Sequence, residues 1–178
     1  MLAAGGVSIA DISTLAHGST IVINALTERR GARTGLITTR GFRDVLEIAR
    51  GNRPDLYNLT YRKPEPFVPR YLRAEITERI DYKGRVQRPV ELSELPAIVN
   101  RFRAEGVEAI AICFLYSFLN EAHEVAVKTE IARLWPEIDV TASNDIIREW
   151  REYERTSTTV FSAFVMPKVR NYARRLES

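Results

Sequence analysis

The segment Val107-Glu108-Ala109-Ile110-Ala111-Ile112-Cys113-Phe114-Leu115 decides the fold class of this chain. It is apolar at every position except Glu108 and is rich in residues that favour strands. An unbroken apolar run of this length is typical of a strand that is covered on both faces, as strands are in a parallel sheet. We therefore expect this segment to be a central strand of an α/β fold.

Helical patterns lie on both sides of this strand. Apolar residues recur at spacings of three and four, the period of a helix with one buried face. They are Leu95, Ile98, Val99 and Phe102 before the strand, and Val127, Ile131 and Leu134 after it. Further strands are expected at residues 34–38 and 138–141, and a last helix at about residues 151–175. Alternating strands and helices predict a mostly parallel sheet.

Residues 51–90 interrupt this alternation. Four prolines, at positions 54, 64, 66 and 69, forbid a regular helix in the first half. Apolar and polar residues then alternate up to a turn at Lys83-Gly84. This pattern predicts a β-hairpin in which residues 71–82 pair with residues 85–90. We interpret residues 51–90 as a proline-rich loop and hairpin inserted into the α/β fold.

Composition excludes several classes of protein. The net charge is +3, and basic and acidic residues are interspersed, whereas a nucleic-acid-binding protein concentrates positive charge in one patch. Cys113 is the one cysteine, so the chain has no internal disulfide, and we expect this thiol to be buried. No apolar stretch is long enough to span a bilayer, and the first residues do not resemble a signal peptide. These features predict a cytoplasmic protein.

Three stretches of the sequence have the form of family motifs. The first is His17-Gly18-Ser19-Thr20 followed by Asn24-Ala25-Leu26, the second is Gly31 to Ile48 (GARTGLITTRGFRDVLEI), and the third is Arg151 to Val160 (REYERTSTTV). These stretches resemble motifs of the hydantoinase A/5-oxoprolinase family, and they occur in the family's order and at compatible spacing over almost the whole chain. The chain is therefore identified as a partial N-terminal region of this family, covering residues 1–178.

The resemblance implies a partial ribonuclease H-like core of the actin-like ATPase superfamily. It also implies an ATP- and Mg2+-dependent enzyme that opens a cyclic amide, such as a hydantoin or 5-oxoproline, by phosphorylating the amide oxygen. Its partners would be the small-molecule substrate and the remaining parts, or a second subunit, of the enzyme. Two alternatives stay open: a subunit of an acetone- or acetophenone-type carboxylase, and a non-catalytic interaction module.

The first candidate site is the turn at residues 17–20. A strand that meets a helix N-terminus there would offer backbone donors and hydroxyl groups to an anion. Gly18, Ser19 and Thr20 are therefore candidates for binding nucleotide or substrate, together with Asn24 one helical turn later. His17 could contact substrate or phosphate, so His17 and Glu154 are the candidates for catalytic residues, and the sequence assigns the catalytic role to neither. The alternative is a capped helix in which these residues have structural roles.

The second candidate site is the start of the last helix. Glu154 could hold magnesium-bound water, and Arg155 could bind a phosphate group. The alternative is a solvated helix start with local ion pairs. We expect His123 to lie at the surface, and no group of residues shows the spacing of metal ligands.

Members of the family begin with a glycine-rich, phosphate-binding segment, and residues 4–7 (AGGV) do not match it. The resemblance therefore predicts that this chain alone does not hydrolyse ATP. It also predicts that a sheet edge or an apolar face is uncovered, so that the chain forms a homodimer.

Overall fold

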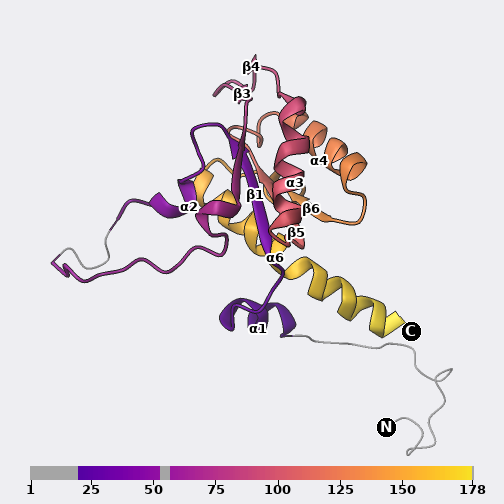
Figure 1. The fold of residues 1–178 in the computed structure, drawn as a ribbon. Coiled ribbons are helices and arrows are strands. Elements are labelled where there is room, and N and C mark those ends of the chain that lie inside the picture. Colours follow the sequence, from indigo (N-terminus) through magenta and orange to yellow (C-terminus); the bar gives the residue numbers. More distant parts are fainter. Residues whose placement is uncertain (1–19, 53–56, 178) are drawn as a thin grey trace, which may run out of the picture.

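The computed structural model describes residues 20–52 and 57–177, and Figure 1 shows a sheet with helices on both of its faces. The strands are β1 (Thr34–Thr39), β2 (Arg73–Ile76), β3 (Arg79–Ile80), β4 (Val86–Arg88), β5 (Ala109–Cys113) and β6 (Asp139–Ala142). The α-helices are α1 (Ile21–Thr27), α2 (Val45–Ile48), α3 (Leu95–Ala104), α4 (Ala122–Leu134), α5 (Ser143–Ile146) and α6 (Glu152–Glu177). Short 3-10 turns, η3 (Arg70–Leu72) and η4 (Leu92–Glu94), precede β2 and α3.

The apolar run forms β5, and β5 lies inside the sheet as the sequence predicts. The strand order is β2-β1-β5-β6, every neighbouring pair is parallel, and all five residues of β5 are buried. The predicted α/β class and parallel sheet are thus confirmed. The narrower assignment to an actin-like ATPase core stays a prediction.

Helices α3 and α4 cover one face of the sheet, and α6 covers the other (Figure 1). Side chains alternate between faces along a strand. Because Thr156 of α6 donates a hydrogen bond to the Cys113 sulfur (3.3 Å), Cys113, Ala111 and Ala109 face α6. On the opposite face, a Cβ atom added to Gly35 would lie 2.7 Å from the Phe102 ring of α3. Small residues therefore let a helix approach the sheet closely from either side.

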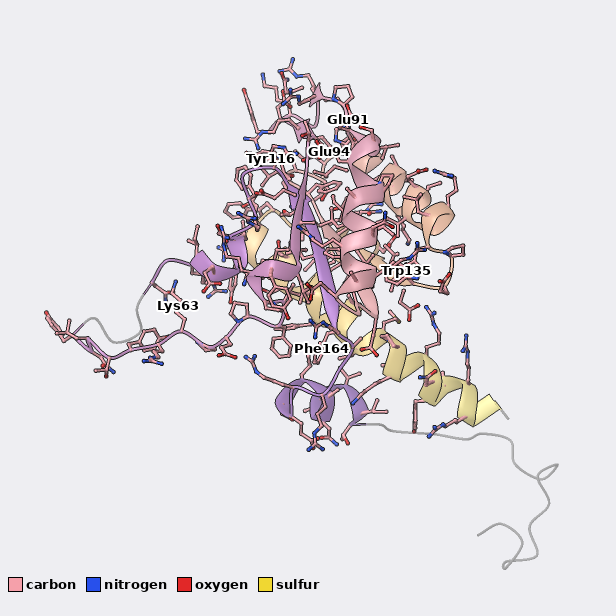
Figure 2. All side chains as sticks on the ribbon, viewed as in Figure 1. Lys63, Glu91, Glu94, Tyr116, Trp135 and Phe164 are labelled. Atoms are coloured by element: carbon pink, nitrogen blue, oxygen red, sulfur yellow. The ribbon has the colours of Figure 1, made fainter. Side chains whose placement is uncertain are left out.

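Trp135 closes the far end of the α3–α4 pair (Figure 2). It follows the last turn of α4 and is buried. The Arg103 guanidinium of α3 lies 4.9 Å from its ring centroid and donates a hydrogen bond to the Leu134 carbonyl (2.7 Å). Arg103 thus connects the C-terminal ends of both helices. Its positive charge also interacts favourably with the negative end of each helix dipole.

Gly31 marks a close approach between α1 and α6. A Cβ atom at this position would lie 2.3 Å from the ring of Phe164, which is far inside contact distance. Helix α1 ends at Thr27, four residues before Gly31, and Arg29 adopts a left-handed conformation (φ 51°). Gly31 is therefore required for packing rather than for ending the helix.

The predicted hairpin is partly wrong. Arg73–Ile76 does not pair with residues 85–90 but joins the main sheet as β2, parallel to β1. The antiparallel pairing is confined to β3 and β4. An edge strand of a main sheet can have the same alternation of apolar and polar residues as a hairpin strand, so the pattern does not reveal the partner. The wider interpretation of residues 51–90 as an insertion stays a prediction.

Within the described residues, no helix combines the length and the apolar character that a membrane span requires. Residues 17–19, which carry part of the first candidate site, lie outside the described ranges.

Candidate functional site

A cavity of about 760 Å³ opens where β1 and β5 end. Gly41 and Phe42 line it just after β1, Leu115 and Tyr116 line it just after β5, and residues 150–154 close it from the start of α6. We call it the carboxyl-edge pocket. In open α/β sheets, ligands bind outside the carboxyl ends of the strands, so the pocket lies where this fold places a ligand site.

Three arginines line the carboxyl-edge pocket, namely Arg50, Arg79 and Arg151, together with the acidic residues Asp44, Glu152 and Glu154. The Arg79 guanidinium lies 5.0 Å from the Phe42 ring centroid, and that of Arg151 lies 5.1 Å from the Trp150 ring centroid. Both arginines line the pocket. An aromatic face attracts a cation without neutralising it. These two arginines therefore remain able to bind an anionic group such as a phosphate.

Glu154, a candidate from the sequence, also lines this pocket. Its Oε1 atom accepts a hydrogen bond of 2.6 Å from Nε of Arg50. This hydrogen bond, helped by the charges of Arg50 and Arg151, lowers the pKa of Glu154 below its ordinary value. Glu154 is thus an ionised acceptor that joins the segment after α2 to the start of α6.

The backbone around the pocket adopts conformations that are rare for residues with a side chain. Ala49 has φ 53° and ψ −135°, and Tyr116 has φ 55°. Both residues line the carboxyl-edge pocket. Residues in sparsely populated regions cluster at ligand sites, where the surrounding structure holds them in place. The two outliers are therefore a second sign of a functional site here.

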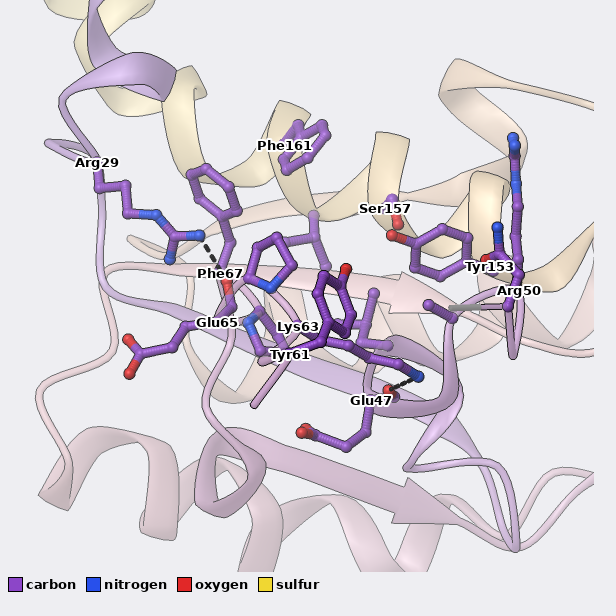
Figure 3. Close-up of a pocket in the computed structure, with 16 residues that line it drawn as sticks. Arg29, Glu47, Arg50, Tyr61, Lys63, Glu65, Phe67, Tyr153, Ser157 and Phe161 are labelled. Carbon is purple, nitrogen blue, oxygen red and sulfur yellow. Dashed lines mark hydrogen bonds between the residues drawn. The ribbon is translucent and has the colours of Figure 1, made fainter. Parts of the chain in front are cut away.

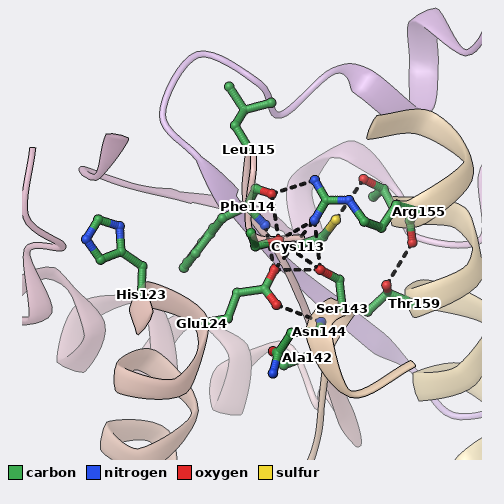
Figure 4. A network of polar contacts seen from close by, with 12 residues as sticks. Cys113, Phe114, Leu115, His123, Glu124, Ala142, Ser143, Asn144, Arg155 and Thr159 are labelled. Carbon is green, nitrogen blue, oxygen red and sulfur yellow. Dashed lines mark hydrogen bonds and ion pairs between the residues drawn. The ribbon is translucent and has the colours of Figure 1, made fainter. Parts of the chain in front are cut away.

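The Arg155 guanidinium lies in a buried network next to the pocket (Figure 4). It donates hydrogen bonds to the Phe114 carbonyl (2.6 Å) and to the hydroxyl groups of Ser143 (2.9 Å) and Ser117. The side chain is 1% exposed. In this arrangement Arg155 fastens α6 to the end of β5, and its expected contact with nucleotide stays a prediction.

Glu124 is the carboxylate of the same network, and the sequence analysis missed it. It is fully buried, and its Oε1 atom lies 3.9 Å from Nη1 of Arg155. It accepts hydrogen bonds from the backbone of Phe114 (2.9 Å) and Asn144 (2.9 Å) and from the Ser143 hydroxyl (2.7 Å). Helical periodicity finds apolar positions, and a charged residue between them is taken for a surface residue.

His123 is buried, not at the surface as the sequence analysis expected. Its Nδ1 atom lies 2.7 Å from Oε2 of Glu78, and the other oxygen of Glu78 accepts a hydrogen bond from the Thr39 hydroxyl. The Thr39 hydroxyl in turn accepts a hydrogen bond from the backbone of Leu115 (3.0 Å). Burial is possible because a carboxylate from the segment after β2 satisfies the histidine. This chain of contacts links the ends of β1 and β5.

Thr20 and Asn24 lie away from Glu154. Both are exposed on α1, where the Asn24 amide donates to the Thr20 hydroxyl (3.4 Å). Helix α1 packs near Phe164, which follows Glu154 by ten positions (164 − 154) on α6, or about 15 Å along the helix axis. The structure therefore brings Glu154 and Arg155 together but does not bring Thr20 and Asn24 to them.

Among the described residues, no group of three or more His, Cys, Asp or Glu side chains has the arrangement of a metal site. A parallel sheet with a pocket at its carboxyl edge defines the class of α/β ligand-binding domains.

Comparison with known proteins narrows this class. The chain belongs to the hydantoinase/oxoprolinase N-terminal region family, whose model matches residues 2–135. It is 40% identical over 164 residues to a protein of Methanocaldococcus jannaschii, covering 90% of this chain and 24% of that protein. It is 35% identical over 172 residues to the caprolactamase subunit alpha of Pseudomonas jessenii, covering 96% of this chain and 25% of the subunit.

Solved structures show the same relationship. The ATP-dependent caprolactamase from Pseudomonas jessenii aligns with a TM-score of 0.89 and 34% identity, over 99% of this chain and 26% of that chain. Nucleotide-free acetone carboxylase aligns with a TM-score of 0.81 and 27% identity, over 96% of this chain and 26% of that chain. The chain thus spans about a quarter of the length of these relatives.

Proposed function

We propose that this chain is part of an ATP-dependent enzyme that opens a cyclic amide, and that its carboxyl-edge pocket receives a phosphate-bearing ligand. The observation that carries the proposal is the cavity at the ends of β1 and β5, with Arg79 and Arg151 on its wall. The caprolactamase and 5-oxoprolinase relatives support the substrate class.

The residues of the pocket fit a phosphate group. A guanidinium binds phosphate through two parallel hydrogen bonds, and aromatic stacking leaves the edge of the group free. A Cβ atom at Gly41 would meet nothing within 4 Å, so a ligand has room next to the backbone there. When bound, ATP would supply a phosphoryl group that activates the amide oxygen of the substrate.

Each part of the chain has a distinct role in this proposal. Arg79 and Arg151 bind and orient the anionic ligand. Glu154 holds Arg50 at the wall of the pocket through a hydrogen bond. Arg155 fixes the start of α6 through its hydrogen bond to the Phe114 carbonyl. Since the described residues contain no cluster of metal ligands, we assign no ligand of Mg2+ to them.

A ketone carboxylase is the second candidate. It is favoured by the likeness to acetone carboxylase and by 31% identity to the acetophenone carboxylase gamma subunit of Aromatoleum aromaticum. The same pocket would then serve ATP-dependent activation of an enolate oxygen.

Assays of the complete protein, with any partner subunit, separate these candidates. ATP-dependent ring opening of ε-caprolactam, hydantoin or 5-oxoproline is expected, measured as ADP formed together with the ring-opened product. ADP formation that requires bicarbonate and a ketone would favour the carboxylase. If no ATP is consumed with either class of substrate, both candidate functions are contradicted.

Substitution tests the pocket itself. Arg79→Ala should raise the KM for ATP at least about tenfold, because a charge-assisted hydrogen bond is worth about 1.5–3 kcal/mol. Arg88→Ala is the matched control, since Arg88 pairs with Arg79 across the β3–β4 hairpin but is exposed and does not line the pocket. Equal effects of the two substitutions would show that the pocket does not bind ATP.

A further inference from the structure

A second cavity, of about 510 Å³, lies between α6 and residues 61–67 (Figure 3). Its volume is within the range of small-molecule sites, about 300–1,000 Å³. Ala49, Arg50 and Tyr153 line both this cavity and the carboxyl-edge pocket, so the two cavities are neighbours. The proposed function assigns no ligand to the second cavity. We call it the aromatic pocket.

Aromatic rings form a large part of the lining. Phe67 packs edge-to-face against Phe161 of α6, with ring centroids 4.8 Å apart and ring planes at 78°. Tyr61 and Tyr153 add two further rings (Figure 3). Aromatic rings attract one another in edge-to-face or offset arrangements, with centroids about 4.5–7 Å apart. A ligand that carries an aryl ring can therefore extend this arrangement while its ring is removed from water.

Two cations of the lining stay charged and keep free donors. Arg29 donates to the Glu65 carbonyl (2.6 Å), and its guanidinium lies 4.6 Å from the Phe67 ring centroid. Lys63 donates to two backbone carbonyl groups of α2 (2.8 and 3.3 Å). These acceptors are neutral and use only part of the donors of a guanidinium or an ammonium group. Both cations therefore remain able to bind an anion.

The other charged residues of the lining are paired or directed elsewhere. Arg50 donates to Glu154 (2.6 Å), and Glu47 accepts a hydrogen bond from the buried Arg73 (3.0 Å). Figure 3 shows the Glu65 carboxylate directed away from the aromatic rings. The pocket thus keeps two cations near a single unpaired carboxylate. This balance favours a monoanion, because Glu65 repels a doubly charged group more strongly than a singly charged one.

We infer that the aromatic pocket binds an aryl carboxylate, that is, a monoanion that carries an aromatic ring. A guanidinium binds a carboxylate through two parallel hydrogen bonds, and Arg29 provides this group. The ring of the ligand lies against Phe161 and Phe67. The hydroxyl groups of Tyr61 and Ser157, which have no hydrogen-bond partner within the described residues, also line the pocket and can donate to the carboxylate.

This site is additional to the proposed function and does not depend on it, because neither a nucleotide nor a cyclic amide takes part. Equilibrium binding to the complete protein tests it. Phenylacetate and its neutral analogue phenylacetamide are titrated without ATP, and binding is followed by calorimetry. Phenylacetate should bind about fivefold or more tightly than phenylacetamide. Added salt should weaken the binding of phenylacetate but not that of phenylacetamide, because salt screens a charge pair.

A matched pair of variants locates the carboxylate. Arg29→Met should weaken phenylacetate binding about fivefold, the upper range for a partly exposed ion pair, and should leave phenylacetamide binding unchanged. Arg30→Met is the control, since Arg30 is exposed beside Glu28 (3.4 Å), does not line the pocket and should leave both affinities unchanged.

Several outcomes would overturn the inference. They are the absence of binding by either compound, equal affinities for phenylacetate and phenylacetamide, and equal effects of Arg29→Met and Arg30→Met on phenylacetate. If Arg29→Met abolishes the binding of both compounds, the pocket itself is damaged, and Arg29→Lys decides. That variant keeps the charge and must still prefer phenylacetate. Ring-opening assays do not enter these measurements, so the inference and the proposed function fail separately.

Discussion

Arg155 and Glu124 form an ion pair that is almost completely removed from water. Burying two charges is costly, and the cost is recovered only where hydrogen bonds satisfy both groups. Here the backbone of Phe114 contributes to both, because its N–H donates to Glu124 and its carbonyl accepts from Arg155. The pair therefore fixes the geometry at the end of β5, next to the carboxyl-edge pocket.

Breaking this pair should be far more costly than breaking an exposed one. Arg155→Met leaves Glu124 buried and unpaired, and is expected to lower the free energy of unfolding by about 3–5 kcal/mol. Arg133→Met removes an exposed partner of Glu130 and should lower the free energy of unfolding far less, because solvent screens exposed ion pairs. Urea denaturation of both variants measures the difference, and equal losses would contradict the assigned role of the network.

Glu154 provides a pH-dependent contribution to stability. Since Arg50 lowers its pKa in the folded state, the contribution is fully present above the pKa of an unfolded glutamate, about 4.3. It is lost as the pH falls through the lowered folded-state pKa.

The stability difference between the wild type and Glu154→Gln should therefore shrink as the pH falls from 6 to 3, when denaturation is measured at low ionic strength. High salt at pH 6 should reduce the difference as well, because salt screens a partly exposed pair. A difference that does not vary with pH would rule out this contribution.

At the scale of single residues, the sequence predicted candidate residues only where they lie in a recognisable motif. Glu154 lines a pocket as a member of the third family-like stretch, whereas Glu124, Glu78 and His123 carry no pattern at all. A buried charge is recognised by its partners, and these come from segments far apart in sequence. Only the folded chain places Glu78 beside His123, 45 positions later.

Among the elements, the connection that follows α2 is strained. Ala49 lines the carboxyl-edge pocket with a backbone conformation that normally requires glycine. The Arg50–Glu154 hydrogen bond directly after Ala49 holds the connection against α6. The strain is thus located at the wall of the carboxyl-edge pocket.

Glycine should relieve this strain. A residue in such a region costs about 1–3 kcal/mol, and glycine adds about 0.5–1 kcal/mol of conformational entropy to the unfolded chain. Ala49→Gly is therefore expected to raise the free energy of unfolding by about 1 kcal/mol. Ala97→Gly, on the exposed side of α3, should lower it by about 0.5–1 kcal/mol. Thermal and urea denaturation measure the stability of both variants. A loss of stability in both would contradict the expected relief of strain at Ala49.

The helices and strands were predicted correctly where the residue pattern is compatible with a single structure. The buried face of α3 and the position of β5 are examples. It was wrong for β2, because apolar alternation does not say which strand is the neighbour.

Over the whole molecule, large apolar side chains remain exposed, among them Tyr82, Trp150 and Ile48. Strands β2 and β6 each have one neighbour in the four-stranded sheet. Exposed patches and strand edges tend to bind another chain. Two relatives are named as subunits, caprolactamase subunit alpha and the acetophenone carboxylase gamma subunit.

We therefore expect this chain to self-associate when it is produced alone, most simply as a twofold dimer. Light scattering after gel filtration should give twice the mass of one chain, and dilution should shift the population toward the monomer. A single monomeric species at high concentration would contradict the expectation.

Helix α6 follows all the strands of the four-stranded sheet in the sequence, and this order has a consequence for synthesis. The strands leave the ribosome before the 26-residue helix that covers their Cys113 face. At about 5–20 residues per second, that helix takes roughly one to five seconds to be made. The parallel sheet gains few contacts between sequence neighbours, so it forms slowly in this interval. A nascent chain would thus present an apolar surface that chaperones bind, until α6 emerges and covers it.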